Sequence, residues 1–419
     1  MRSILVVAND AVPAAGLPVS GSGLRAWGLG EGLRSRGHEV RYAVPTRSIP
    51  GDVTPPDDFL TYEDPELPGL LARDRADVLL FQHWPRLAAA AALDVPIVLD
   101  LHGPLMVETA FQQRPDADFI AMAGAKLAAF RRADFISCAG EFQRRYFLPW
   151  LTLAGGDVTT ESVVVMPVSF PPAAPAHEAN DGEVTFVYGG MFLPWQDPSL
   201  GLTTLASVLE SEGVGRLDFF GAPHPMFEME IGILAQIEDR LRTCSRVMVH
   251  GLRPRDELLD HYRRADVALD LMRRNNERDL AFTTRTVEYL WCGLPVVYGD
   301  YGELAPLVRE YDAGWIVSPD DGDAIAETLR KILRDPADVR RRGANAQRLV
   351  RERLNWERTI NPLDDFCRDP RRRSASHPPL VVAPTEAEAL RAELTALRST
   401  KTFRAFEPLR RLYARFRRA

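Results

Sequence analysis

The sequence predicts an α/β protein with two doubly wound domains and a helical extension at its C-terminus. Short, nearly continuous apolar runs alternate with longer segments of helical periodicity through most of the 419 residues. Such runs are typical of parallel strands that helices cover on both faces. The alternation stops at a proline-rich stretch over 171–183 and then starts again. Two blocks around a linker indicate two domains that face each other across a cleft.

The alternation defines the expected elements of each block. Strands of the first block are expected at 4–8, 40–44, 78–81, 97–101, 135–139 and 163–168, with helices near 23–36, 105–132 and 141–154. Strands of the second are expected at 184–189, 217–221, 247–251, 267–272, 295–299 and 315–319, with helices between them and over 323–355. The resulting units are a first domain (1–170), a linker (171–183), a second domain (184–367), a second linker (368–384) and a helical tail (385–419). Within the second unit, 356–367 is a candidate for crossing back to the first domain.

Composition excludes several classes of protein. The net charge of −7 divides into +8 for residues 371–419 and −15 for the rest, and an acidic body argues against a nucleic-acid-binding core. The four cysteines lie far apart, which suggests neither a disulfide framework nor a zinc cluster. We see no signal peptide and no apolar run of the roughly 18–20 residues that a membrane span requires. A reduced, cytoplasmic setting is the expectation.

The most informative segment is TTRTVEYLWCGLPVVYG at 283–299, which reads as a loop, a helix and a buried strand. Its apolar residues fall at helical spacing on one face: Val287, Leu290, Trp291 and Leu294. Arg285 and Glu288 lie on a different face near the helix N-terminus, where free N–H groups and the helix dipole favour an anion. A phosphate with a hydroxyl-rich group beside it suits this arrangement. The alternative is an ordinary surface pair three residues apart.

This segment resembles the nucleotide-sugar site of family 4 glycosyltransferases, in which a glutamate shortly before a G-x-P-V turn holds the ribose. Here that glutamate is Glu288 and the turn is Gly293-Leu294-Pro295-Val296. The resemblance covers roughly residues 1–365 and is most specific over 246–299. It implies the GT-B architecture, two Rossmann-like domains across a cleft, with a nucleoside-diphosphate sugar as donor substrate and no further cofactor. It also assigns Thr284, at the helix start, to the donor site.

Three further segments match the family at sheet edges where ligands bind. Ser20-Gly21-Ser22-Gly23 follows the first strand and resembles the family's glycine-rich loop, although a structural turn explains it equally well. A dehydrogenase fingerprint fails here, because the glycines come too late and no acidic residue ends the second strand. His102 ends a buried strand and matches the histidine that the family places beside the donor sugar. Gly251 and Leu252 match the turn that cradles the base, with a plain βα turn as the alternative.

The sequence departs from the family's pattern in the residues that hold the sugar. A second glutamate is usual eight positions before Glu288, and that position is Leu280. Glu277 or Asp279 is the candidate to take over the role of this missing glutamate. The catalytic candidates are therefore His102, Glu277 and Arg285.

A second departure concerns the diphosphate. The family's Arg and Lys pair after the first strand of the second domain is missing, and the segment 188–196, which contains Gly190, stands there instead. Charge neutralisation then falls on Arg285, Arg278 and the helix N-terminus. The full set of donor-binding candidates is Gly21, Gly23, Gly190, Gly251, Leu252, Thr284, Arg285 and Glu288. Asp321-Gly322-Asp323 mimics a metal-binding D-x-D motif, but helix capping explains it better, so no catalytic metal is expected.

The tail carries a separate signal. Over 403–419 an aromatic and aliphatic stripe alternates with six arginines, which is the pattern of a helix lying in an anionic membrane interface. The alternative is a helix that packs on the body or on a partner chain.

These observations predict a cytoplasmic glycosyltransferase, attached at the inner membrane face through its tail, that transfers a sugar from a nucleoside-diphosphate donor to an acceptor hydroxyl. A glycan or lipid-linked acceptor of surface polysaccharide synthesis is expected, with retention of configuration. The alternatives are a catalytically silent scaffold of the same fold and a sugar-nucleotide epimerase.

Overall fold

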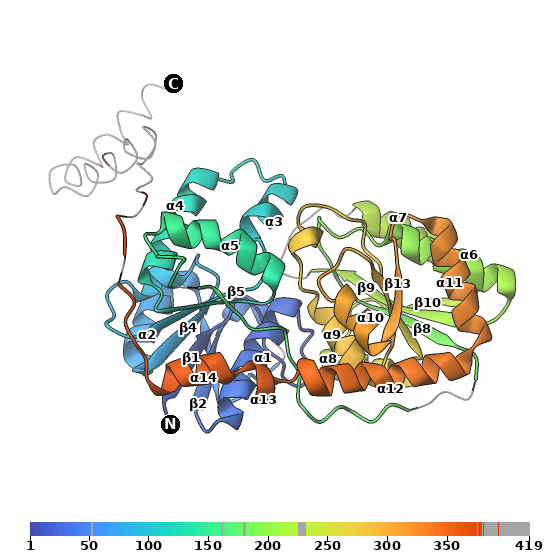
Figure 1. The fold of residues 1–419 in the computed structure, drawn as a ribbon, viewed down its shortest axis with the longest axis horizontal. Helices are drawn as coiled ribbons and strands as arrows, with labels where there is room; N and C mark the ends of the chain where they lie inside the picture. The colour runs from blue at the N-terminus through green and yellow to red at the C-terminus, as the bar shows by residue number, and fades with distance from the viewer. Residues whose placement is uncertain are drawn as a thin grey trace, which may run out of the picture.

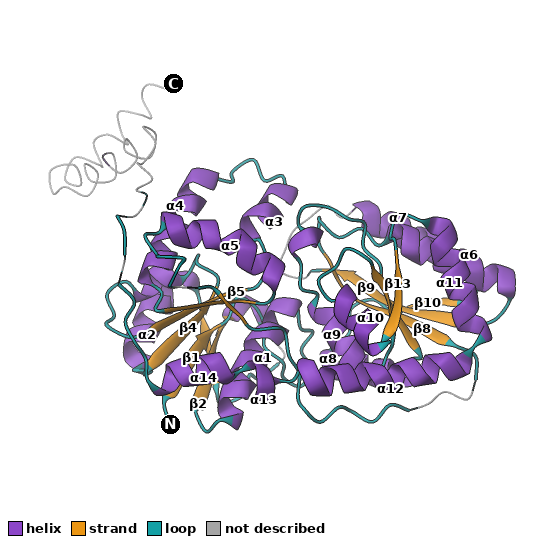
Figure 2. Ribbon diagram, viewed as in Figure 1, coloured by secondary structure: helices purple, strands orange, loops and turns teal. Residues whose placement is uncertain are grey.

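The computed structural model contains two α/β domains side by side, each built on one parallel sheet (Figures 1 and 2). It describes residues 1–51, 53–160, 162–178, 182–224, 232–374, 376–378, 380 and 393. The predicted architecture of two doubly wound domains is confirmed. The tail at 403–419 lies outside the described residues, so the predicted amphipathic helix stays a prediction.

The first domain has a sheet of seven parallel strands in the order β3-β2-β1-β4-β5-β6-β7. Its strands are β1 (Ser3–Val7), β2 (Glu39–Pro45), β3 (Phe59–Tyr62), β4 (Val78–Gln82), β5 (Ile97–Leu101), β6 (Phe135–Cys138) and β7 (Val164–Val165). Its helices are α1 (Gly21–Ser35), α2 (Leu67–Asp74), α3 (Leu105–Phe111), α4 (Phe119–Arg132) and α5 (Glu141–Leu153). Short 3₁₀ turns occur at Thr46–Ser48, Asp64–Glu66 and Leu87–Ala90.

The second domain has six parallel strands in the order β10-β9-β8-β11-β12-β13. The strands are β8 (Thr185–Phe192), β9 (Arg216–Pro223), β10 (Val247–Val249), β11 (Val267–Asp270), β12 (Val296–Gly299) and β13 (Gly314–Val317). The helices are α6 (Ser199–Glu212), α7 (Gly232–Arg242), α8 (Arg255–Arg264), α9 (Thr284–Trp291), α10 (Ala305–Tyr311), α11 (Gly322–Arg334) and α12 (Pro336–Arg353). A 3₁₀ turn, η4 (Arg278–Leu280), precedes α9.

Two expectations about elements need correction. The single helix expected over 105–132 is two helices, α3 and α4, because Pro115 and a polar segment interrupt it and the Asp118 side chain caps the start of α4. Strand β3 and helix α2 were not expected, since both are short and lie in a proline-rich region. The Asp321 side chain accepts a hydrogen bond from the Ala324 N–H at the start of α11, as its reading as a cap predicts.

The chain crosses back to the first domain after α12, along the lower side of the molecule in Figure 1. Helices α13 (Trp356–Thr359) and α14 (Asn361–Arg368) join the first-domain core, where Ile360, Leu363 and Cys367 are buried. The second domain therefore ends near residue 353 and not at 367.

The segment after α14 is not a free linker as far as residue 380. Arg372 pairs with Asp134, and the Leu380 N–H donates to the Leu153 carbonyl. The described residues between 369 and 380 therefore lie along the first domain, which corrects the linker assigned to 368–384.

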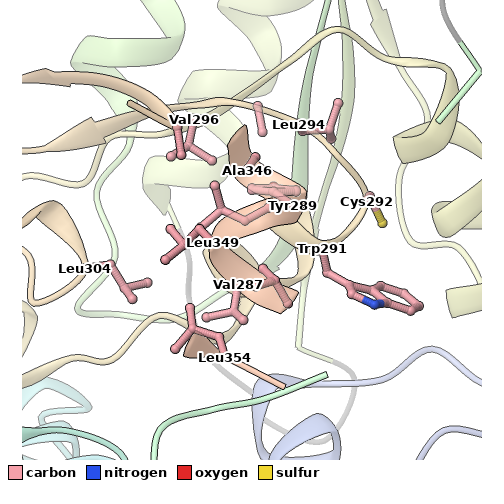
Figure 3. Packing of buried hydrophobic residues seen from close by; sticks show 14 of the residues in the cluster. Val287, Tyr289, Trp291, Cys292, Leu294, Val296, Leu304, Ala346, Leu349 and Leu354 are labelled. Carbon is pink, nitrogen blue, oxygen red and sulfur yellow. The ribbon is translucent and has the colours of Figure 1, made fainter. Parts of the chain in front are cut away.

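The apolar stripe of α9 packs in the second-domain core, as its spacing predicts. Val287, Leu290 and Leu294 are fully buried and Trp291 nearly so. They pack with Leu349 and other residues of α12 (Figure 3). This packing fixes the orientation of α9 and hence the direction of its polar N-terminal residues.

Candidate functional site

Loops from the carboxyl ends of both sheets meet between the two domains. The Arg255 N–H donates to the Leu17 carbonyl at 3.0 Å, which joins the start of α8 to the glycine-rich loop. Gly21 is the first residue of α1 and not part of a loop, and a Cβ on it would lie 3.3 Å from the Thr284 hydroxyl oxygen, so the N-termini of α1 and α9 meet. Two residues predicted to bind the donor, Gly21 and Thr284, are thus neighbours across the domain boundary.

Arg285 is held by the segment that replaces the family's Arg and Lys pair. Its guanidinium donates to the Tyr188 hydroxyl and to the Gln196 side-chain oxygen, both at 2.8 Å. A Cβ on Gly190 would lie 2.7 Å from the guanidinium carbon, so only glycine leaves room for it there. Burial lowers the pKa of Arg285, but the neighbouring Tyr188 and Asp270 outweigh it, so the pKa is raised and the group is a permanent cation. The segment at 188–196 therefore positions a cation at the end of β8.

Glu288 is buried and does not pair with Arg285, so the surface-pair alternative is wrong. Its carboxylate accepts a hydrogen bond from the Arg255 Nε at 2.9 Å. The Arg255 guanidinium in turn lies 5.1 Å from the centre of the Trp27 ring on α1. Glu288 therefore has a cationic partner in the same domain, while α1 of the first domain covers that partner.

Glu277 and Arg278 form a buried, bidentate ion pair at the start of η4, with the second contact at 2.7 Å. Such a fork fixes the carboxylate in one orientation. Asp279, the other replacement considered for the missing glutamate, instead pairs with Arg274 at the surface. Beside the buried pair is a small pocket lined by Asp270, Met272, Arg278, Ala281, Thr283, Tyr298, Gly299 and Tyr301. The structure thus buries Glu277, whereas Asp279 lies at the surface.

His102 lies at the carboxyl end of β5, as predicted. Among the described residues its buried Nδ1 has no hydrogen-bond partner, and it lies 4.0 Å from Asp100, which forms a buried ion pair with Arg25. The His102 ring is 4.4 Å from that of His83. Burial lowers the pKa of His102 to about 4, so the imidazole is neutral at pH 7. A neutral imidazole suits a hydrogen bond to a hydroxyl better than a contact with an anion.

The remaining predicted residues occupy different surroundings. A Cβ on Gly23 would lie 1.7 Å from the Ala11 carbonyl oxygen, so this glycine allows α1 to pack against the preceding loop. Gly251 has a positive φ of 71°, and the space beside its Cα is open. Leu252 next to it is 40% exposed. Gly23 thus serves packing, whereas the turn at 251–252 remains accessible to a ligand.

Two residues at the domain boundary were missed by sequence reasoning. Glu303 of the second domain accepts hydrogen bonds from the backbone N–H groups of Glu141 and Phe142 at the start of α5. Glu108 on α3 belongs to the first domain, and the charge of Glu277 of the second domain contributes to raising its pKa. Neither glutamate lies in a recognisable motif, so only the fold reveals them.

Comparisons with known proteins agree with this architecture. Residues 174–349 match the sequence profile described as "Glycosyl transferases group 1". A curated relative, the D-inositol 3-phosphate glycosyltransferase of Streptomyces bingchenggensis, is 26% identical over 183 residues. That match covers 43% of this chain and 39% of the relative, so the chain spans about two fifths of the length of this relative.

Solved structures match over more of the chain. Sucrose-phosphate synthase from Thermosynechococcus elongatus aligns with a TM-score of 0.67 at 19% identity, over 88% of this chain and 98% of that one. Anabaena HepE in complex with UDP-glucose aligns with a TM-score of 0.61 at 13% identity, over 87% and 99% of the two chains. At these identities the likeness establishes the fold alone, and the fold is GT-B.

Proposed function

We propose that the chain is a glycosyltransferase that uses a nucleoside-diphosphate sugar, since residues 174–349 match the profile of the glycosyl transferases group 1. The observation that carries the proposal is the placement of Arg285. Tyr188, Gln196 and Gly190 together hold its guanidinium at the end of β8, next to the N-terminus of α9. A fixed cation beside free helical N–H groups is suited to a diphosphate.

The proposed reaction requires positioning more than covalent chemistry from the protein. The bond between the sugar's anomeric carbon and the diphosphate oxygen breaks, and a bond from the acceptor oxygen to that carbon forms. In the retaining course that we propose, the acceptor's proton passes to an oxygen of the leaving diphosphate. Arg285 stabilises the charge that develops on the diphosphate, as donors in water-poor sites do. Neutral His102 would hold a sugar hydroxyl without competing for that charge.

We also propose the finer setting: a glycan or lipid-linked acceptor, reached at an anionic membrane face through residues 403–419. The six arginines of that segment supply about 1 kcal/mol each near such a surface. Among the described residues, no helix has the length and apolarity needed to cross a membrane. A variant lacking residues 400–419 is expected to lose binding to anionic vesicles, which sedimentation at low salt would measure. Full-length protein that ignores such vesicles would remove the membrane setting.

One experiment distinguishes the glycosyltransferase from the two alternatives, a silent scaffold and a sugar-nucleotide epimerase. The chain is to be screened by thermal shift against UDP, GDP, ADP and TDP, and then supplied with the sugar donor of the nucleotide that binds. Binding with release or transfer of the sugar supports the glycosyltransferase. If no nucleotide binds, the result supports a catalytically silent scaffold. The missing Arg and Lys pair and the apolar Leu280 are consistent with that alternative. Conversion of the donor without release identifies an epimerase.

A further inference from the structure

The N-terminus of α9, beside Arg285, lacks the side-chain cap that its sequence offers. Threonine is a common N-cap residue, because its hydroxyl oxygen accepts a hydrogen bond from the second or third N–H group of the helix. Thr283 occupies the N-cap position, yet within the described residues its side chain forms no capping hydrogen bond. Its hydroxyl therefore does not compete for the first N–H groups of α9, which have no partner within the helix.

The Thr283 hydroxyl is engaged instead in a chain of hydroxyl groups at the first turn of α9. It lies 2.7 Å from the Thr286 hydroxyl oxygen and 3.1 Å from that of Tyr298. The Thr286 hydroxyl in turn donates to Oδ2 of Asp270, the last residue of β11. Asp270, Thr286 and Tyr298 are all buried, so this hydroxyl chain is largely shielded from water.

The bond to Asp270 fixes the direction of the whole hydroxyl chain. Thr286 has one hydroxyl proton and donates it to Asp270, so it must accept from Thr283. Burial raises the pKa of Tyr298, so its phenol keeps its proton and donates to Thr283. A Cβ on Gly302 would lie 2.4 Å from the Tyr298 hydroxyl oxygen, so glycine leaves the room that the phenol requires. Both the proton and an acceptor site of Thr283 are thus committed away from the helix N–H groups.

Asp270 itself is only partly satisfied by this chain. Its Oδ1 is buried and has no hydrogen-bond partner in the part of the chain that the structure describes. Asp270 lines a cavity of about 10 Å³ together with Thr283 and Arg278. This cavity has room for about one water molecule, so it is not itself a substrate site. A carboxylate kept in such a place needs another reason, and the bond to Thr286 supplies one.

We propose that Asp270 is a positioning residue for the diphosphate: through Thr286 it holds the Thr283 hydroxyl away from α9 and reserves the first N–H groups for the ligand. The inference rests on the proposed glycosyltransferase function and deepens it by assigning a residue that does not touch the ligand. A capped helix would have to lose its cap before those N–H groups could bind a phosphate oxygen. An uncapped helix binds the anion without that loss.

The first test restores a cap. Thr283→Asn places one of the strongest N-cap residues at the same half-buried position. Calorimetric titration compares UDP, GDP, ADP and TDP with their nucleosides, and the pair that the wild type binds best reports the effect. The diphosphate should bind about tenfold more weakly and the nucleoside equally well, because only the diphosphate requires the N–H groups. Thr328→Asn, the same substitution on α11, is the matched control.

A second pair of variants separates the capping effect from a merely structural one. Thr286→Val cuts the chain between Thr283 and Asp270, which frees the Thr283 hydroxyl to cap α9, so the diphosphate should again bind about tenfold more weakly. The double variant with Thr283→Val also lacks the competing hydroxyl and should recover most of the lost affinity. A structural network predicts the opposite, since the double variant has lost more of its hydrogen bonds.

The outcomes distinguish this positioning role from the proposed function. Wild-type diphosphate affinity in Thr283→Asn, or no recovery in the double variant, overturns the positioning role and leaves the proposed function standing. Thr283→Asn decides alone if the buried Thr286→Val does not fold. A wild type that binds none of the four diphosphates overturns the proposed function, and the positioning role falls with it.

Discussion

The two faces of the site differ in how their charged groups are satisfied. On the second-domain face Arg285 bonds to Tyr188, Glu288 to Arg255 and Glu277 to Arg278. On the first-domain face, within the described residues, Nδ1 of His102 and of His83 is buried without a hydrogen-bond partner.

This difference indicates two kinds of preorganisation. A face of locked ion pairs presents fixed charge, which suits a diphosphate of constant structure. On the first-domain face the Arg25–Asp100 pair is neutralised internally, and the neutral imidazoles of His83 and His102 present hydrogen-bonding atoms that suit sugar hydroxyls. We therefore expect substitutions on the second-domain face to change nucleotide affinity and those on the first-domain face to change acceptor use or stability.

The largest effect is expected from Arg285→Ala. Loss of the charge-assisted bonds to the diphosphate should weaken nucleoside-diphosphate binding by about 1.5–3 kcal/mol, while the bare nucleoside is hardly affected. Calorimetric titration with both ligands measures the contrast, with Arg351→Ala, an exposed arginine on α12, as control. Equal losses for the two ligands would show that Arg285 is structural and would break the contrast between the two faces.

Glu288→Gln should produce a smaller effect of a different kind. If Glu288 binds the ribose, nucleoside and nucleoside diphosphate should weaken alike, by roughly 1 kcal/mol, because both ligands carry the ribose. The substitution also deprives Arg255 of its anionic partner, so the protein should unfold at a lower temperature. Arg255→Gln separates the roles: it should reduce stability as well, but a ribose-binding Glu288 would keep its ligand. Unchanged nucleoside affinity in Glu288→Gln would remove the assignment.

The second-domain face was largely predictable from sequence, and the first-domain face was not. The stripe of α9 and the glycine before Pro295 are local patterns, so Arg285 and Glu288 could be placed beside a sheet edge. Their partners could not, because Tyr188 and Arg255 are 97 and 33 residues away in the chain. Glu108 could not be identified from the sequence, because 105–132 was expected to be one helix and Glu108 lies in no motif. The shift of its pKa depends on charges of the other domain, which only the fold reveals.

A last feature of the first domain lies beneath this face, where Lys126 of α4 is fully buried. In the part of the chain that the structure describes, its Nζ has no hydrogen-bond partner, and aromatic rings surround it, the nearest being Trp150 with its centre at 3.9 Å. Tyr146, which borders Glu108, is also part of this cage at 4.6 Å. Burial lowers the pKa of Lys126 to about 6, so the amine is mostly neutral at pH 7.

Lys126→Met should therefore stabilise the first domain, while its effect on ligand binding should be the smallest among these substitutions. In the unfolded chain a lysine titrates near 10.4, so between about pH 6 and 10 unfolding takes up one proton and the wild type becomes more stable as pH rises. Methionine fills a similar volume without this penalty, so the variant should be more stable than the wild type at pH 7. Thermal unfolding from pH 6 to 10 should show the gain shrinking as pH increases. A gain that is independent of pH would mean that Lys126 is charged in the folded protein, and the neutral character of this face would have to be abandoned.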